Sequence, residues 1–281
     1  MDLLQKRAEQ AEEAEDFETA CELWKELAAK EREPFFFLRY GRTAQKLEKW
    51  EEAESAFSQA LVLDPSSSLV MENMGSLWAN RSDKSERQAF ETAKEWFLRA
   101  LKHERSTGLL TQLGATYVAL NDGRAARNAF EEAIRIDPDY EEALYNLAAL
   151  DEKTNPQRSV ELLERAIQID PDYAIAHQVL GRLSQRANDL PRAEYHFRRS
   201  LEIDPADYWS NIYMANLLGV LGRNVEAEQA YKFATNLHPE IAGGVETFAR
   251  FLESIGKDEE ATKVRAQGSV QRPSESAGGL G

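Results

Sequence analysis

The chain has 281 residues, of which 42% are hydrophobic and 30% are charged, with a formal net charge of −15. The hydrophobic content suffices for a packed core, and no apolar run reaches the ~18 residues that span a bilayer, which argues against a disordered chain and against membrane insertion. The acidic balance repels phosphate backbones and disfavours nucleic-acid binding. The start of the chain lacks the apolar segment of a secretory signal, and Cys21 has no second cysteine to pair with, so we expect a cytoplasmic location.

Small residues recur along the chain at nearly constant spacing. One small site, here called the glycine site, is occupied in steps of 33 or 34 residues with a single step of 39. A large apolar residue follows it with the same period, at a position here called the aromatic site, and a proline closes most periods. The glycine site comprises Gly41, Gly75, Gly114, Ala148, Gly181, Ala215 and Ala249, and the aromatic site comprises Trp24, Phe57, Phe97, Phe130, Leu163, Phe197 and Tyr231.

Each period contains the pattern of two amphipathic helices. In the fourth period, Leu110, Leu113 and Tyr117 lie on one helical face, and the sequence NDG at 121–123 interrupts the pattern. Phe130 then lies on the apolar face of a second helix. A single helical hairpin cannot bury both of its faces, so neighbouring hairpins are expected to stack into one continuous core.

This pattern resembles the tetratricopeptide repeat, which combines a 34-residue period with small residues at fixed sites and a closing proline. The resemblance implies an all-α fold, a right-handed superhelical solenoid of antiparallel helix pairs. We expect a single solenoid over residues 1–267 and a disordered tail over 268–281. Its eight repeats are predicted at 1–33, 34–66, 67–105, 106–139, 140–172, 173–206, 207–240 and 241–267, the last of them a cap.

The third repeat and the two terminal repeats depart from the pattern. The third has six extra residues, around 81–87, and Ser85 with Gln88 matches a capping box that predicts a long second helix over 85–102. The insertion is either a tolerated surface loop or a protruding contact element. The first repeat is strongly acidic, and Arg265 occupies the last aromatic site, as expected for the polar caps of a complete array.

The sequence offers no catalytic or metal-binding motif. It contains no phosphate-binding glycine loop, no nucleophile elbow and no zinc-binding histidine pair. His177 falls at a packing position of its helix, and Cys21 lies beside the small residue of a helix crossing, so we expect both to be buried and structural. We therefore expect no enzymatic activity, no cofactor and no metal.

The resemblance also implies a site for a protein or peptide partner. In the family, the first helices of the repeats line a concave groove at repeat positions 2, 5, 9, 12 and 13, counted so that the glycine site is position 8. Arg182 and Arg186 lie one turn apart and are placed to accept a carboxylate, although packing or plain solvent exposure is the alternative for them and for the large apolar groove residues. Large apolar residues at positions 2 and 5 are expected to be exposed anchors. The candidate groove residues are Phe35, Leu38, Arg42, Tyr145, Gln178, Arg182, Arg186, Trp209, Ile212 and Asn216.

The function predicted from these features is that of a non-enzymatic scaffold or adaptor that binds a peptide or helix in the groove. The preferred ligand would carry large apolar anchors and an acidic element near Arg182 and Arg186. The alternatives are a substrate-recognition or regulatory subunit of a separate enzyme, and a scaffold that self-assembles through its convex face. The oligomeric state is left open.

Overall fold

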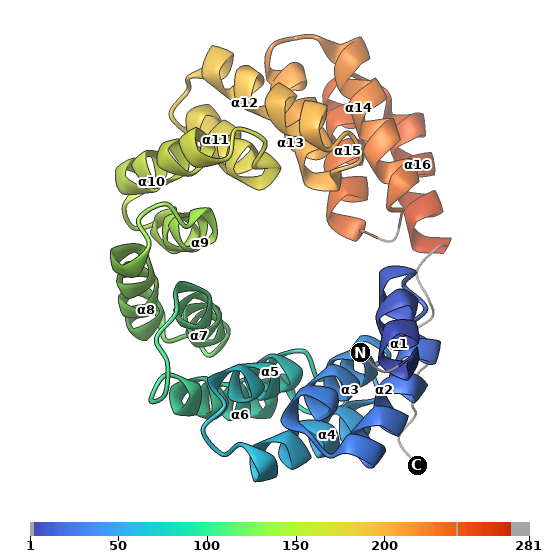
Figure 1. Ribbon diagram of the computed structural model, residues 1–281. Helices are drawn as coiled ribbons and strands as arrows, with labels where there is room; N and C mark the ends of the chain where they lie inside the picture. The colour runs from blue at the N-terminus through green and yellow to red at the C-terminus, as the bar shows by residue number, and fades with distance from the viewer. Residues whose placement is uncertain (1–2, 240, 271–281) are drawn as a thin grey trace, which may run out of the picture. The chain divides into compact units, whose positions relative to one another are not determined.

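The computed structural model describes residues 3–239 and 241–270, and in these ranges it contains sixteen α-helices and no strand (Figure 1). The predicted all-α fold is confirmed. The chain forms two compact units, residues 1–150 and 151–281. The first unit contains α1 (Leu3–Glu13), α2 (Phe17–Glu31), α3 (Pro34–Lys46), α4 (Trp50–Leu63), α5 (Ser68–Ala79), α6 (Glu86–Ala100), α7 (Thr107–Ala119), α8 (Gly123–Ile136) and all but the last residue of α9 (Glu141–Asp151). The second contains α10 (Pro156–Ile169), α11 (Ala174–Arg186), α12 (Leu190–Ile203), α13 (Tyr208–Val220), α14 (Asn224–Leu237), α15 (Ala242–Ser254) and α16 (Asp258–Val270).

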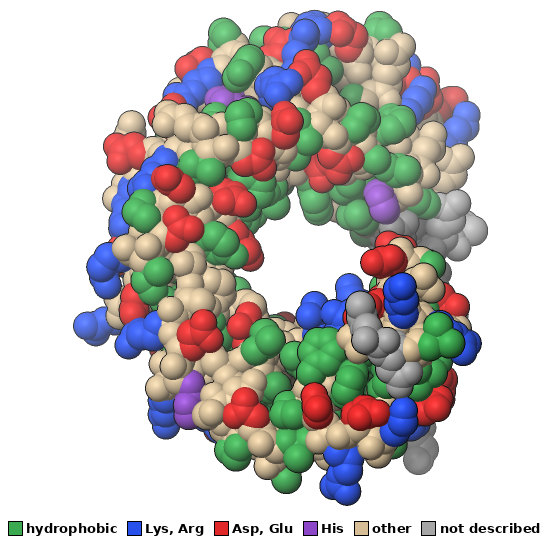
Figure 2. All heavy atoms as spheres, in the orientation of Figure 1, with side chains coloured by type: hydrophobic (Ala, Val, Ile, Leu, Met, Phe, Trp, Pro, Cys, Tyr) green, Lys and Arg blue, Asp and Glu red, His purple; other side chains and the backbone are tan. Residues whose placement is uncertain are grey.

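Within each unit, consecutive helices pack as hairpins. In the first unit these are α1–α2, α3–α4, α5–α6 and α7–α8, and in the second they are α11–α12, α13–α14 and α15–α16. The second helix of a hairpin also packs against the first helix of the next, and the first helices α3, α5 and α7 contact one another in order, as do α11, α13 and α15. The first helices therefore share one face of each unit, where the groove was predicted. Charged side chains of both signs are scattered over the visible surface of both units (Figure 2).

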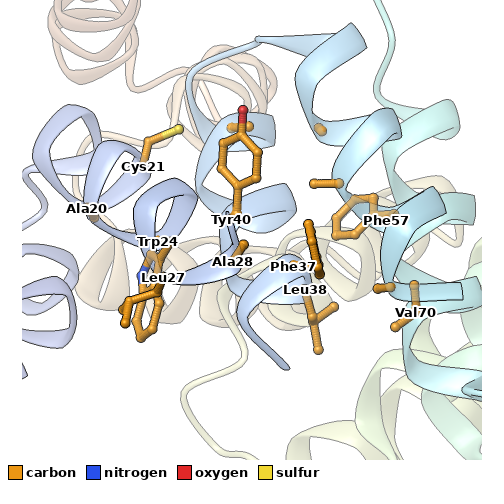
Figure 3. Packing of buried hydrophobic residues seen from close by; sticks show 14 of the residues in the cluster. Ala20, Cys21, Trp24, Leu27, Ala28, Phe37, Leu38, Tyr40, Phe57 and Val70 are labelled. Atoms are coloured by element: carbon orange, nitrogen blue, oxygen red, sulfur yellow. The ribbon is translucent and has the colours of Figure 1, made fainter. Parts of the chain in front are cut away.

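An aromatic ring packed directly on a glycine holds most of these hairpins together. A Cβ atom added to Gly41 would lie 2.4 Å from Cε1 of Phe57, and one added to Gly181 would lie 2.5 Å from the ring of Phe197. The same contact recurs twice more in the first unit. Trp24, Phe37 and Phe57 come from three successive helices and contribute to one buried cluster (Figure 3). The glycine site is thus explained by the ring that covers it, while hairpins with alanine there have another residue type at the aromatic site.

A buried arginine ties the inserted segment of the third repeat to α4. Arg81 is 5% exposed, and its guanidinium donates hydrogen bonds to Glu51 at 3.1 Å, Glu54 at 2.7 Å and Asp83 at 2.8 Å. Ser85 is the N-cap residue of α6, but its side chain makes no capping hydrogen bond, so the predicted capping box is wrong. The helix itself, Glu86–Ala100, is shorter than the predicted 85–102. Arg81 therefore anchors the start of the inserted segment to α4.

The last helix extends three residues past the predicted end of the array at 267. Residues 271–281 of the predicted tail lie outside the described residues. Arg265, at the last aromatic site, forms surface ion pairs with Glu246 and Glu253 in place of a buried ring contact. None of the helices within the described ranges combines the length and the apolar character that crossing a membrane requires.

Candidate functional site

Three hairpins of the first unit line an open cavity of about 630 Å³. The helix α3 contributes five side chains to its wall, among them the groove candidate Arg42 and, one turn later, Lys46. Basic side chains stand out over α3 in Figure 2. Residues at predicted groove positions of two successive first helices thus come together in one cavity. Its full lining is Glu12, Phe17, Arg39, Arg42, Thr43, Gln45, Lys46, Glu48, Trp50, Asn73, Ser76 and Asn80.

The carboxylate of Glu12, on the wall of this cavity, has both oxygens engaged. Its Oε1 accepts a hydrogen bond from Nε1 of Trp24 at 2.8 Å, and its Oε2 pairs with Nη2 of Arg39. The Arg39 guanidinium also lies 5.1 Å from the centroid of the Trp24 ring, at cation–π distance. Glu12 is therefore committed to Trp24 and Arg39 and does not neutralise the other cations of the cavity.

Arg42 and Lys46 carry the uncompensated positive charge of the cavity. Both are exposed, and neither forms an ion pair with a carboxylate in the part of the chain that the structure describes. Lys46 Nζ lies 5.9 Å from the centroid of the Phe17 ring. Burial, and then the positive charge of Arg42, lower the pKa of Arg39. The charged residues that line the cavity are three cations and two carboxylates, a net charge of +1 on a chain whose net charge is −15.

Arg182 and Arg186 of the second unit, predicted to bind a carboxylate of a partner, already bind a carboxylate of the chain itself. Glu152, directly after α9, accepts from Nη1 of Arg186 at 2.6 Å, and its second oxygen pairs with Nη2 of Arg182. Arg182 also donates to the hydroxyl of Tyr213 at 3.3 Å and lies 5.4 Å from the centroid of that ring. These arginines, with Gln185 and Tyr213, line a cavity of about 310 Å³. The expectation of two free arginines is corrected, because an internal glutamate holds both.

The predicted apolar anchors divide between exposed and buried positions. Phe35 and Trp209, at repeat position 2, are 44% and 43% exposed. Leu38 and Ile212, at repeat position 5, are 8% and 2% exposed, so the prediction that they are free anchors is wrong. Position 5 lies where the first helices of neighbouring hairpins touch. A Cβ atom added to Gly244 of α15, for example, would lie 3.1 Å from Cδ1 of Ile212.

The remaining candidates serve contacts within the chain. Gln178 donates to Asp207 at 2.8 Å and to Ser210 at 3.2 Å, which ties α11 to α13. Asn216 accepts from the hydroxyl of Tyr231 at 2.6 Å and borders a separate cavity of about 630 Å³ between α13 and α15. Tyr145 is half-buried in α9. The ten predicted residues are therefore spread over both units.

A buried histidine pair was not anticipated. His177 is buried as expected, but its Nδ1 lies 3.0 Å from Nδ1 of His196, and its Nε2 lies 3.3 Å from the carbonyl oxygen of Pro171. Burial lowers the pKa of His196 to about 4 and lowers the pKa of His177 as well. The sequence signal that could have revealed this pair is the presence of two histidines at packing positions of one hairpin. Cys21 is buried, and burial raises the pKa of its thiol. In the described ranges no cluster of His, Cys, Asp and Glu has the arrangement of a metal site.

Comparison with known proteins identifies helical repeats in the middle of the chain. Two family models, both described as tetratricopeptide repeat, match residues 107–150 and 149–208. No curated protein sequence matches the chain. A solved structure described as "Functional Characterization of Pseudomonas Aeruginosa pilF" is 15% identical with a TM-score of 0.67, covering 79% of this chain and 97% of that one.

Two further solved structures are described as tetratricopeptide-repeat proteins. TTC0263 of Thermus thermophilus is 22% identical with a TM-score of 0.51, covering 60% of this chain and 93% of that one. YrrB, described as having an unusual peptide-binding site, is 16% identical with a TM-score of 0.50, covering 68% of this chain and 97% of that one. At these identities the likeness is one of fold.

Proposed function

Because this chain belongs to the tetratricopeptide-repeat family, we propose that it is a non-enzymatic scaffold that binds a segment of another protein along the first helices of its hairpins. The segment binds as an extended peptide or as a helix. Among the described residues, no group of His, Cys, Asp and Glu is placed to hold a metal ion.

The observation that carries this proposal is the cavity of the first unit. Five of the residues that line it fall at the groove positions predicted from the repeat register: Arg42, Gln45, Lys46, Ser76 and Asn80. Nearby, Phe35 is a large apolar side chain at a position that the stack leaves exposed. Exposed aromatic and arginine side chains are the usual energetic anchors of protein interfaces. The peptide-binding site described for YrrB, on a similar fold, supports the same use.

The proposal is tested by selecting binders from a displayed random-peptide library on the full chain and measuring their affinities for variants. Arg42→Ala and Trp209→Ala alter exposed groove positions. Val62→Ala is the matched control, because Val62 is 79% exposed on a second helix. We expect selected peptides to lose affinity on at least one groove variant and to retain it on the control. Peptides that bind all three variants as tightly as the wild type would place the binding surface elsewhere. Ile212→Ala is unsuitable because it opens a cavity in the core.

Self-assembly through the second helices is the other candidate, and one observation favours it. Val62 and Leu63, neighbours on α4, are 79% and 42% exposed. Large exposed apolar side chains, where they adjoin, mark association surfaces. Light scattering over a concentration series tests this candidate. A mass that stays that of one chain at all concentrations would exclude it.

A further inference from the structure

Two grooves of the protein carry one glutamate and two cations at the same repeat positions. Glu12 lies four residues after the glycine-site residue of its hairpin, as Glu152 does in the fifth repeat. One and five residues after the glycine site of the next repeat come Arg42 and Lys46 in the first case. Arg182 and Arg186 occupy those positions in the second case. Register alone therefore predicts the same glutamate–cation cluster twice.

Glu12 and Glu152 nevertheless pair with different residues. Glu152 binds both groove arginines, whereas Glu12 binds Trp24 and Arg39 and leaves Arg42 and Lys46 without a carboxylate. Two substitutions in the repeat pattern account for this. Trp24 occupies the aromatic site, where the fifth repeat has Leu163, and it supplies an indole N–H that a leucine lacks. Arg39 occupies the position that Val179 has in the sixth repeat, and it supplies a second cation.

Because Glu12 pairs with Trp24 and Arg39, Arg42 and Lys46 remain available to bind an anion. We propose that the cavity of the first unit binds an acidic segment of a partner protein, with its carboxylates on Arg42 and Lys46. This inference rests on the proposed function and specifies the partner's chemistry. Among the lining residues, the charges of Arg39 and Glu12 cancel, so Arg42 and Lys46 face only the exposed carboxylate of Glu48. Hydrogen bonds between ionised groups are the strong ones, and a guanidinium matches a carboxylate in geometry.

Neutral donors beside the two cations suit the same ligand. Asn73 and Asn80 each use one amide N–H on a carbonyl of their own helix, at 2.7 and 2.8 Å, and each has a second N–H to donate. Asn73 lies in α5 and Asn80 is its C-cap residue, and both line the cavity together with α3. A peptide carboxylate between the two helices would meet cations on one side and amides on the other.

Exposed apolar residues set a second requirement on the partner. Phe35 on α3 and Leu69 on α5 are 44% and 52% exposed, and both occupy repeat position 2. Phe35 precedes Arg42 by seven residues, a rise of about 10 Å along the helix. An extended peptide covers this distance in about three residues. The preferred segment therefore carries a large apolar residue about three residues from its acidic group.

The test is fluorescence anisotropy on the full chain with a short labelled peptide that has a leucine about three residues from a run of glutamates. A counterpart peptide carries glutamines in their place. We expect the glutamine peptide to bind about tenfold more weakly or worse, a difference of about 1.4 kcal/mol. Arg42→Ala combined with Lys46→Ala should cause a similar loss. The matched control, Arg182→Ala with Arg186→Ala, should stay within about twofold of the wild type because Glu152 already holds both arginines. Circular dichroism verifies that every variant is folded.

Each of the following results would overturn the inference. Equal binding of the two peptides would remove the acidic requirement, and wild-type affinity in the Arg42, Lys46 double variant would move the site. Tighter binding of a single-stranded oligonucleotide than of the glutamate peptide would make this a phosphate-polymer site. If library-selected peptides bind through Trp209 regardless of acidic residues, the proposed function stands and this inference fails. If no peptide binds at all, both fail.

Discussion

The groove of the first unit and the groove of the second begin from the same residue pattern and end as different surfaces. In the second unit, Glu152 closes a cluster with Arg182 and Arg186, and only 13% of its own side chain remains exposed. In the first unit, Glu12 turns to Trp24 and Arg39, and its cations remain available. The comparison teaches that a repeat position does not define a binding site by itself. The neighbours that compete for each charge decide whether a groove is open or internally satisfied.

The difference has an energetic consequence for any acidic partner. At the second unit, a partner carboxylate must displace Glu152 and leave that partly buried glutamate without its cations, which costs free energy. At the first unit no such displacement is needed. Both grooves rest on the same hairpin frame, so their contrast can be probed with paired variants.

The largest effects are expected from the shared frame. Phe57 covers Gly41 beneath the first groove, and Phe197 covers Gly181 beneath the second. Phe57→Ala and Phe197→Ala should each lower the free energy of unfolding by about 3–5 kcal/mol, because each removes a fully buried ring. Urea denaturation measures both. Losses below about 1 kcal/mol in either variant would show that the two grooves are not held by the same packing.

A smaller effect should separate the two units by pH. Burial, and the charges of His177 and Arg192, lower the pKa of His196 to about 4. Between pH 6.5 and pH 4, His196 is therefore protonated in the unfolded chain and neutral in the folded protein. This contribution to stability is complete above about pH 6.5 and is lost as the pH falls toward 4. We expect a loss of about 2 kcal/mol between pH 7 and pH 5. In the first unit His103 is exposed.

The pH effect is measured by hydrogen exchange, corrected for intrinsic rates, at the two pH values. Protection should fall in α11 and α12 and persist in α3 and α4. The variant His177→Gln, His196→Gln should show no such loss. Equal acid sensitivity in the variant and the wild type would assign the effect to other groups.

The sequence predicted the hairpins well because their determinants are local and periodic. Gly114 and Phe130 mark a crossing wherever the spacing recurs, and the structure adds only that the ring lies on the glycine. The burial of Leu38 and Ile212 was not predictable in this way, because it depends on how closely neighbouring first helices approach. The partner of Glu12 depends on where one indole N–H points. Tryptophan in place of phenylalanine at the aromatic site was visible, but its orientation needs coordinates.

A still smaller effect tests the diversion of Glu12 directly. Trp24→Phe removes the indole N–H and preserves every charge, and Phe57 shows that phenylalanine suits this site. Unfolding free energy should fall by about 1–2 kcal/mol through the lost hydrogen bond. The released Glu12 should then compete for Arg42, so the glutamate peptide should bind about fivefold more weakly, or about 1 kcal/mol. Unchanged peptide affinity in the folded variant would show that Trp24 does not keep the site open.

The most direct test of the central claim asks whether removing the internal carboxylate opens the closed groove. The parent is the Arg42→Ala, Lys46→Ala variant, whose first groove is disabled, and Glu152→Gln is added to it. Calorimetric titration with the glutamate peptide should show binding recovered by about threefold or more, because Arg182 and Arg186 then lack their carboxylate. If Glu152→Gln leaves the parent's affinity unchanged, the ion pairs of Glu12 and Glu152 do not decide which groove binds an acidic peptide.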